Sequence, residues 1–255
     1  AANLTSQGSK YIFRTSFGQN VSMPKIANYI RDGIKAKSVA VVYVNNDFGK
    51  GGSAAIIKEL EARNIKVAAN LSTEAGQADF AADVVKLKGA NADAVFVYLN
   101  EEESARFLIE AKKQNLDKPL LGETTLLGQK VIDLARDAAN GVKGHVGLTV
   151  DAPIPAVQAF GKKFEERFKY KSDHNGMKGY FAPYMLKAAV EKAGKWDAKA
   201  IAAALHGLTI TPDKIPGILI EASWDDTGEI DRISFLAEIK DGKQVITETL
   251  PKLKK

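Results

Sequence analysis

The sequence predicts an α/β protein built around a doubly wound parallel sheet. Between residues 22 and 149, short β-branched apolar runs alternate with helical segments. Nearly continuous apolar runs of this kind are typical of strands that are covered on both faces. Five such strands with four intervening helices require right-handed crossovers and therefore a parallel sheet. A chain of 255 residues suffices for one large domain or two modest ones.

The elements of this sheet follow in order. The predicted strands are Ser38–Val44, Ile65–Leu71, Asp93–Leu99, Pro119–Gly122 and Lys143–Thr149, and the helices between them cover roughly residues 50–63, 77–88, 102–114 and 127–135. With the flavodoxin-like strand order 2-1-3-4-5, the first and third strands lie side by side while their outgoing connections diverge. A ligand is then expected outside the carboxyl ends of the strands, at that switch point.

After Thr149 the pattern changes to helices without strands between them. A linker, VDAPIP, leads to a helix whose apolar face carries Val157, Phe160, Phe164 and Phe168, then to a helix at Gly179–Ala193 and to one capped by Asp197. The chain ends in two strands joined at Asp241-Gly242, a hairpin signal, and begins with a strand at Tyr11–Thr15. A lone strand cannot cover three apolar helices, so we expect part of a second domain to be missing from this chain or to be supplied from elsewhere.

Composition excludes several classes of function. The net charge is +5, but the lysines are interleaved with acidic residues, which indicates a solvated surface and argues against nucleic-acid binding. The absence of cysteine rules out disulfides, thiolate metal sites and a cysteine nucleophile. The apolar runs are too short to span a bilayer, and the first residues do not read as a signal peptide, so a signal would have been removed from an exported protein. We expect no metal and no cofactor.

The glycines of GKGGS at residues 49–53 suggest a phosphate site, but the spacing matches neither GxxxxGK[ST] nor GxGxxG, and a tight strand-to-helix turn explains them better. No GxSxG elbow is present, and the three histidines lack zinc spacing. His145 lies in an apolar strand and is expected to be a hydrogen-bonded structural residue. A phospho-acceptor receiver domain fits poorly, because it needs an acidic pair before the first helix.

Three loops follow strands at the expected ligand edge, at residues 45–51, 100–104 and 122–129. They offer an aromatic wall, Phe48, the neutral groups Asn46, Asn100 and Thr124, and the carboxylates Asp47, Glu101 and Glu123. A buried carboxylate that meets an ammonium group forms a charge-assisted bond, so a small amine-bearing ligand is expected.

Most of these residues are equally suited to roles within the fold. Phe48 can pack over the following helix, Asn46 and Asn100 can act as caps, and Glu101 suits the first turn of a helix, where the dipole favours acids. Glu123 stands between Gly122 and two threonines directly after an apolar strand, which packing explains poorly. We therefore regard Glu123 as the first candidate.

Ordered stretches along almost the whole chain point to a known family. They are KYIFRTS, VAVVYVNNDFGKGG, ADAVFVYLNEEESARFLIEAKKQNLDKPLLGETT, DAANGVKGHVGLT, IPGILIEASWDDTGEI and FLAEIKDGK. Together they resemble the substrate-binding proteins of branched-chain-amino-acid-type ABC importers, that is, proteins of the leucine/isoleucine/valine-binding type. The resemblance implies a type I periplasmic binding protein fold, in which two α/β lobes joined by three hinge crossings close on a ligand.

Transferred to this chain, the resemblance places residues 1–16 and 150–212 in an incomplete first lobe and 17–149 and 213–255 in the second. Hinges are expected near 16–20, 149–155 and 211–217, and the chain is expected to begin within the fold.

The resemblance also assigns residues to a pocket. It implies that Phe48 is a ligand-facing aromatic, that Asn100 and Glu101 occupy a place where several relatives have an aromatic, and that Glu123, or Thr124 one residue later, receives the ammonium group. Tyr180 or its neighbour Phe181 is expected to reach the pocket from the first lobe.

The leading hypothesis is a non-enzymatic, extracytoplasmic receptor, monomeric when complete, that delivers an amino acid or a related small amine or acid to an ABC importer permease. A ligand-sensing domain of a receptor or regulator with the same fold is the alternative. An enzyme would need two acidic groups with separated pKa values facing one substrate, and we do not expect one.

Overall fold

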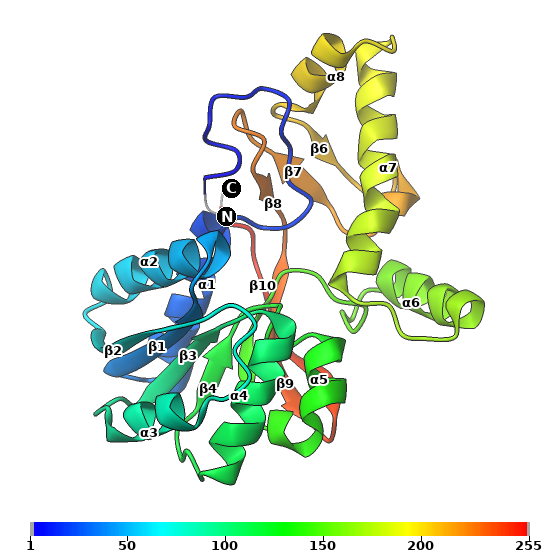
Figure 1. The fold of residues 1–255 in the computed structure, drawn as a ribbon. Coiled ribbons are helices and arrows are strands. Elements are labelled where there is room, and N and C mark those ends of the chain that lie inside the picture. Colours follow the sequence, from blue (N-terminus) through cyan, green and yellow to red (C-terminus); the bar gives the residue numbers. More distant parts are fainter. Residues whose placement is uncertain (1–2, 254–255) are drawn as a thin grey trace. The chain divides into compact units, whose positions relative to one another are not determined.

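The computed structural model describes residues 3–253, which form two compact units (Figure 1). Unit 1 comprises Ser22–Val146 and Leu236–Glu248, and unit 2 comprises 3–21, Gly147–Phe235 and 249–253. The chain passes from unit 2 back to unit 1 between Phe235 and Leu236, and the predicted hinges, including the one near 211–217, stay predictions. Three short strands between Thr209 and Asp231 pair with one another within unit 2. Residues 1, 2, 254 and 255, included in the predicted lobes, lie outside the described residues.

Unit 1 is built on a seven-stranded sheet in the order β10-β9-β5-β4-β3-β1-β2, which confirms the predicted order 2-1-3-4-5. The first five strands are β1 Ser38–Val44, β2 Lys66–Thr73, β3 Ala94–Tyr98, β4 Leu120–Gly122 and β5 Lys143–Val146, and successive neighbours among them pair in parallel. The last two strands, β9 Ser234–Lys240 and β10 Lys243–Leu250, are joined at Asp241-Gly242. Both turn residues have positive φ, which confirms the predicted hairpin turn.

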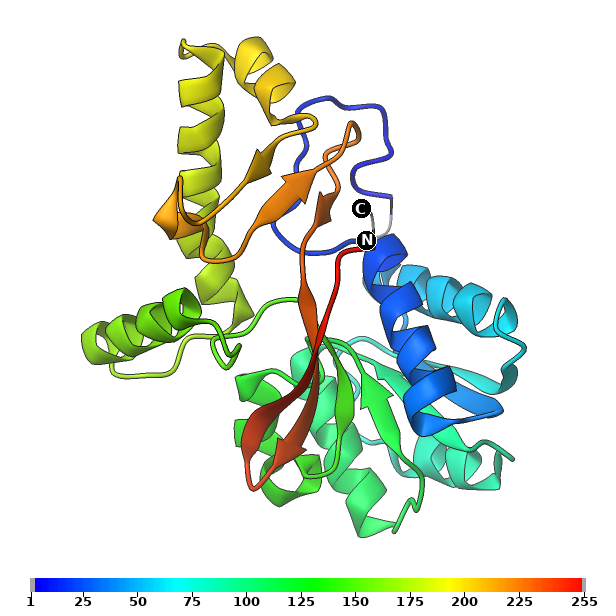
Figure 2. The same ribbon diagram turned by 180° about the vertical axis from the view of Figure 1, so that it is seen from behind.

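Helices cover both faces of the sheet (Figure 2). The helical elements of this part of the chain are α1 Gln19–Tyr29, the π-helical turn η1 Ile30–Ile34, α2 Asp47–Glu61, α3 Ala81–Gly89, α4 Glu101–Lys113, α5 Gln129–Ala135 and the 3₁₀ turn η2 Arg136–Ala139. Strand β1 shows why both faces are apolar, because Ala40, Val42 and Val44 join a core with α3, α4 and α5. Val39 and Val41 point the other way and join a core with α1 and α2. Period-two alternation thus places one strand in two cores.

Unit 2 contains α6 Pro155–Phe168, α7 His174–Ala193, α8 Ala198–Leu205 and the 3₁₀ turn η3 Pro216–Ile218, with the antiparallel strands β6 Thr209–Ile210, β7 Ala222–Trp224 and β8 Ile230–Asp231. The predicted cap of α8 is confirmed, since the Asp197 carboxylate accepts a 2.9 Å hydrogen bond from Ala200 N. Helix α7 begins five residues before the predicted Gly179, because Asp173 caps it through the backbone N–H groups of Asn175 and Gly176. No helix among residues 3–253 is long and apolar enough to cross a membrane.

The prediction of a strand at Tyr11–Thr15 is wrong, because this segment forms no regular ladder. It is held instead by individual hydrogen bonds to β7 and to the turn between β7 and β8. Arg14 N donates to Gly228 O in this turn, and the indole of Trp224, the last residue of β7, donates to Arg14 O. Gly228 has a positive φ, and a Cβ on it would lie 2.2 Å from Ile12 O. The turn therefore approaches the N-terminal segment too closely for a side chain.

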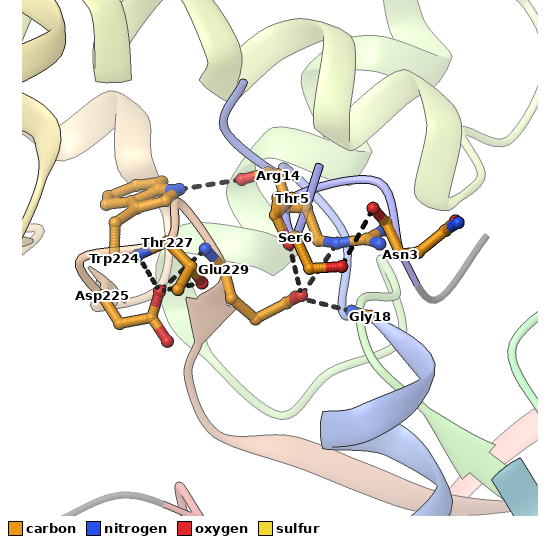
Figure 3. A network of polar contacts seen from close by, with 9 residues as sticks. All are labelled: Asn3, Thr5, Ser6, Arg14, Gly18, Trp224, Asp225, Thr227 and Glu229. Carbon is orange, nitrogen blue, oxygen red and sulfur yellow. Dashed lines mark hydrogen bonds and ion pairs between the residues drawn. The ribbon is translucent and has the colours of Figure 1, made fainter. Parts of the chain in front are cut away.

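A buried polar network fastens the same N-terminal segment (Figure 3). Arg14 Nε lies 2.9 Å from Glu229 Oε2, and the exposed fractions of the two side chains are 9% and 4%. The Glu229 carboxylate also accepts hydrogen bonds from Gly18 N, at 2.8 Å, and from the Thr5 hydroxyl, at 3.3 Å. An anion with two hydrogen-bond donors and a guanidinium beside it is well compensated for its loss of water.

Candidate functional site

The carboxyl edge of the unit 1 sheet brings the predicted loops together. The loops after β1, β3 and β4 all leave the sheet at this edge, because the three strands are parallel neighbours. A Cβ built on Gly128, in the loop after β4, would lie 3.9 Å from a carboxylate oxygen of Glu101, at the start of α4. The loops of residues 100–104 and 122–129 are therefore adjacent, as the strand order requires.

Phe48 is partly buried and stacks on Tyr98, with ring centroids 4.3 Å apart and an interplanar angle of 22°. Tyr98 is the last residue of β3, and its ring stacks in turn on Phe96. Phe48 also packs against both apolar cores of unit 1. These contacts support the alternative that Phe48 packs within the fold. That the Phe48 ring also contacts a ligand stays a prediction.

Asn46 caps α2, because its side-chain oxygen accepts a 2.9 Å hydrogen bond from Gly49 N. The capping alternative for Asn46 is thus confirmed, and it explains why α2 begins at Asp47 rather than near residue 50. Asp47 is exposed in the first turn of this helix, where the dipole favours an acid.

Two glycines of the GKGG stretch are needed for close packing. A Cβ on Gly49 would lie 1.8 Å from Val44 O, and a Cβ on Gly52 would lie 2.0 Å from the ring of Tyr98. Both contacts are far inside van der Waals distance, so α2 can approach β1 and β3 this closely at residues without side chains. This arrangement supports the turn-and-packing interpretation of the motif.

We expect Gly52→Ala to lower the free energy of unfolding by about 1–3 kcal/mol, because the stacked Tyr98 ring has little room to move away from the added methyl group. Chemical denaturation measures the change. The matched control is Gly89→Ala in α3, where a Cβ meets no atom within 4 Å and φ is not positive. There we expect a gain of about 0.4–1 kcal/mol, and equal stabilities for the two variants would contradict the packing argument.

Asn100 lies at the cap position of α4 but makes no cap bond with its side chain. Its amide donates instead to Glu103 at 2.9 Å, and the same oxygen of this buried carboxylate accepts a 2.8 Å bond from Gly76 N. Burial alone would raise the pKa of Glu103, but these hydrogen bonds outweigh it and hold the pKa below its ordinary value. Glu101 is half-buried in the first turn of the helix.

Glu123 follows β4 directly and is 8% exposed. Its Oε1 lies 2.9 Å from Nδ1 of His145, a residue of β5 with no exposed surface. A buried carboxylate thus stands at the predicted edge, with an imidazole beside it. Thr124, the alternative one residue later, is half-buried in the same loop.

Tyr180 belongs to unit 2, in α7, and is 39% exposed. Its ring contacts Phe160 of α6, with centroids 4.7 Å apart, and Tyr184 one turn further along α7. The hydrogen bond with Tyr184, with burial as a smaller cause, raises the pKa of the Tyr180 hydroxyl above its ordinary value. Phe181, its predicted alternative, is buried in the same helix.

Three residues join the predicted set at this edge: Tyr98, Glu103 and the pairing partner His145. Each lies at or just beyond the carboxyl end of a strand or at the helix start that follows it. Their position at the end of a strand or the start of the next helix is therefore the only sequence feature that could have identified them. Their partners depend on the register between strands, which the sequence pattern does not contain.

An open hollow of about 900 Å³ lies elsewhere in unit 1. It is lined by the end of α4, by η2 and by the segments that lead into β4 and β5. These segments meet the amino ends of the strands, so the hollow is not part of the predicted ligand edge.

Comparisons with known proteins agree with this architecture. Residues 1–244 match the family model described as periplasmic binding protein. The leucine-, isoleucine-, valine-, threonine-, and alanine-binding protein of Pseudomonas aeruginosa is 28% identical over 236 residues, covering 92% of this chain and 61% of that protein. The Leu/Ile/Val-binding protein of Escherichia coli is 26% identical over 241 residues, covering 92% and 62%. The chain thus spans 61–62% of the length of these curated relatives.

Two solved structures have the same fold. A branched-chain amino acid transporter substrate-binding protein of Streptococcus pneumoniae, in complex with isoleucine, aligns with a TM-score of 0.83 at 20% identity, over 99% of this chain and 70% of its own. A solute-binding protein of an ABC transporter from R. palustris, in complex with benzoate, aligns with a TM-score of 0.88 at 21% identity, over 99% and 69%. The fold is therefore the type I periplasmic binding fold, and the chain belongs to the periplasmic binding protein family.

Proposed function

We propose that the protein is an extracytoplasmic receptor, without enzymatic activity, that captures an amino acid or a related small amine or acid for delivery to an ABC importer permease. The observation that carries the proposal is Glu123, a buried carboxylate directly after β4 at the carboxyl edge of the parallel sheet. The family match supports the receptor role, and the named ligands of the relatives, branched-chain amino acids and benzoate, support the ligand class.

In this proposal the unit 1 edge supplies one wall of the binding site. Glu123 receives the ligand's ammonium group in a charge-assisted hydrogen bond, which is typically worth about 1.5–3 kcal/mol. The neighbouring loops, with Phe48, Asn100, Glu101 and Thr124, enclose the rest of the ligand. Binding shifts the protein toward a closed state if that state holds the ligand more tightly, as the family resemblance implies.

The test is isothermal titration calorimetry of the complete protein against leucine, isoleucine, valine and benzoate. We expect one of these ligands to bind with micromolar affinity. We expect Glu123→Gln to lower the affinity for an amine-bearing ligand about 10- to 100-fold, because a neutral amide replaces the anion. The matched control is Glu61→Gln. Glu61 is an exposed carboxylate at the end of α2, so this substitution removes one negative charge at a position outside the ligand edge. Unchanged binding in Glu123→Gln would remove the ammonium role from this residue.

A further inference from the structure

Two neighbouring strands place an acidic and a basic side chain side by side at the ligand edge. Strands β4 and β5 are parallel, with Leu121 opposite Lys143 and Gly122 opposite Gly144. The next step in this register pairs Glu123 with His145, and their side chains do meet, with Oε1 2.9 Å from Nδ1. The contact therefore follows from the sheet and not from a chance approach of two loops.

The surroundings hold this pair in one geometry. A Cβ on Gly144 would lie 2.1 Å from Gly122 O, so the two strands approach each other closely beside the pair. The His145 side chain has no exposed surface and the Glu123 side chain is 11% exposed, which leaves the imidazole no room to turn toward solvent. Groups fixed by packing in this way are pre-organised and lose little entropy when a ligand binds.

The proposed ammonium role of Glu123 uses its ionised carboxylate. For an ionised Glu123 carboxylate, which only accepts hydrogen bonds, the 2.9 Å contact corresponds to the tautomer with the proton on His145 Nδ1. A donor fixed at Oε1 compensates the buried anion for lost water and sets the direction of its other oxygen. The imidazole thus acts on the carboxylate without needing to touch a ligand itself.

We infer that His145 is a positioning residue that holds the Glu123 carboxylate and thereby sets the preference of the site for amine-bearing ligands over their hydroxy-acid analogues. The inference rests on the proposed function. A fixed anion gains most from an ammonium group, which brings a full positive charge to the contact, whereas a hydroxyl in its place donates a hydrogen bond without that charge. If the carboxylate loses its orientation, the ammonium contact loses more than the hydroxyl contact does.

The experiment measures a selectivity ratio, which a merely structural role would leave unchanged. Calorimetry with the complete protein compares the affinity for leucine with that for 2-hydroxy-4-methylpentanoate, its hydroxy-acid analogue. We expect His145→Leu to lower the affinity for leucine about tenfold and to change that for the analogue less than about threefold. His145→Asn is expected to restore most of the ratio, because its amide N–H can donate from near the position of Nδ1.

A double-mutant cycle tests whether His145 acts through Glu123. In the Glu123→Gln background we expect His145→Leu to leave the ratio unchanged, because the anion it positions is already gone. His145→Gln serves as the matched control for Asn, since its longer side chain donates from near Nε2 and should not restore the ratio. If His145→Leu does not fold, the comparison of His145→Asn with His145→Gln still tests the positioning role of His145.

Each outcome is decisive. Parallel losses for both ligands in His145→Leu, or equal ratios in His145→Asn and His145→Gln, would overturn the positioning role while leaving the receptor proposal in place. A wild-type protein that binds leucine no better than its analogue would instead contradict the ammonium role of Glu123, and the inference would fail with it.

Discussion

Replacement of Glu229 by Gln is expected to lower the free energy of unfolding by about 3–5 kcal/mol, the cost of breaking a buried ion pair from one side. The substitution keeps the shape of the side chain but leaves the Arg14 guanidinium buried without its carboxylate (Figure 3). It also weakens the acceptor for Gly18 N and the Thr5 hydroxyl. The N-terminal segment would then lose its ion pair with the β7–β8 turn and keep the hydrogen bonds of Arg14 to Gly228 and Trp224.

Tryptophan fluorescence during urea unfolding measures this effect, because Trp224 is buried in unit 2 beside the network and its indole binds Arg14 O. The matched control is Glu221→Gln, because the side chains of its ion pair with Lys252 are much more exposed, at 45% for the carboxylate and 26% for the lysine. Here we expect less than about 1 kcal/mol. Equal losses in the two variants would show that burial does not strengthen the Arg14–Glu229 pair.

The second large effect is expected at Arg232, which is 2% exposed and lies between two aromatic rings. Its guanidinium carbon is 5.3 Å from the ring centroids of both Phe17 and Phe181, and the side chain donates to Gly147 O and Thr15 O. Burial lowers the pKa of Arg232 to about 10, so the group remains a cation at neutral pH.

We expect Arg232→Met to lower the free energy of unfolding by about 3 kcal/mol. The buried Gly147 carbonyl loses a donor, at about 1–3 kcal/mol, the part-buried Thr15 carbonyl loses another, and the ring contacts lose their charge, whereas relief from burying a cation offsets part of the loss. Arg232→Lys should recover little, because an ammonium group lacks the planar fork that reaches two carbonyls while stacking on rings.

Arg167 supplies the control for this prediction. It also lies over an aromatic ring, Phe168 at 5.4 Å, but is exposed on α6. Arg167→Met is therefore expected to cost less than about 1 kcal/mol in the same urea titration. A loss in Arg232→Met no larger than that in Arg167→Met would contradict the role assigned to the buried cation.

Local patterns in the sequence were sufficient for most of unit 1. Strand β1 was predicted with its observed bounds, and the sheet order followed from the alternation of helices and strands. These features depend on residues close together in the chain, such as the β-branched run of β1 or the cap at Asp197. The strand predicted at Tyr11–Thr15 was wrong, because the partners of this segment lie more than two hundred residues away, at Trp224 and Gly228.

In the candidate site, too, some features follow from the local sequence and others from contacts between residues distant in the chain. The sequence by itself determined the edge at which a ligand is expected, and it singled out Glu123 from its unusual place after β4. Only the tertiary structure decided that His145 meets this carboxylate and that Phe48 stacks on Tyr98. Both contacts depend on the register and spacing of neighbouring strands, which residues distant in the chain set together through packing.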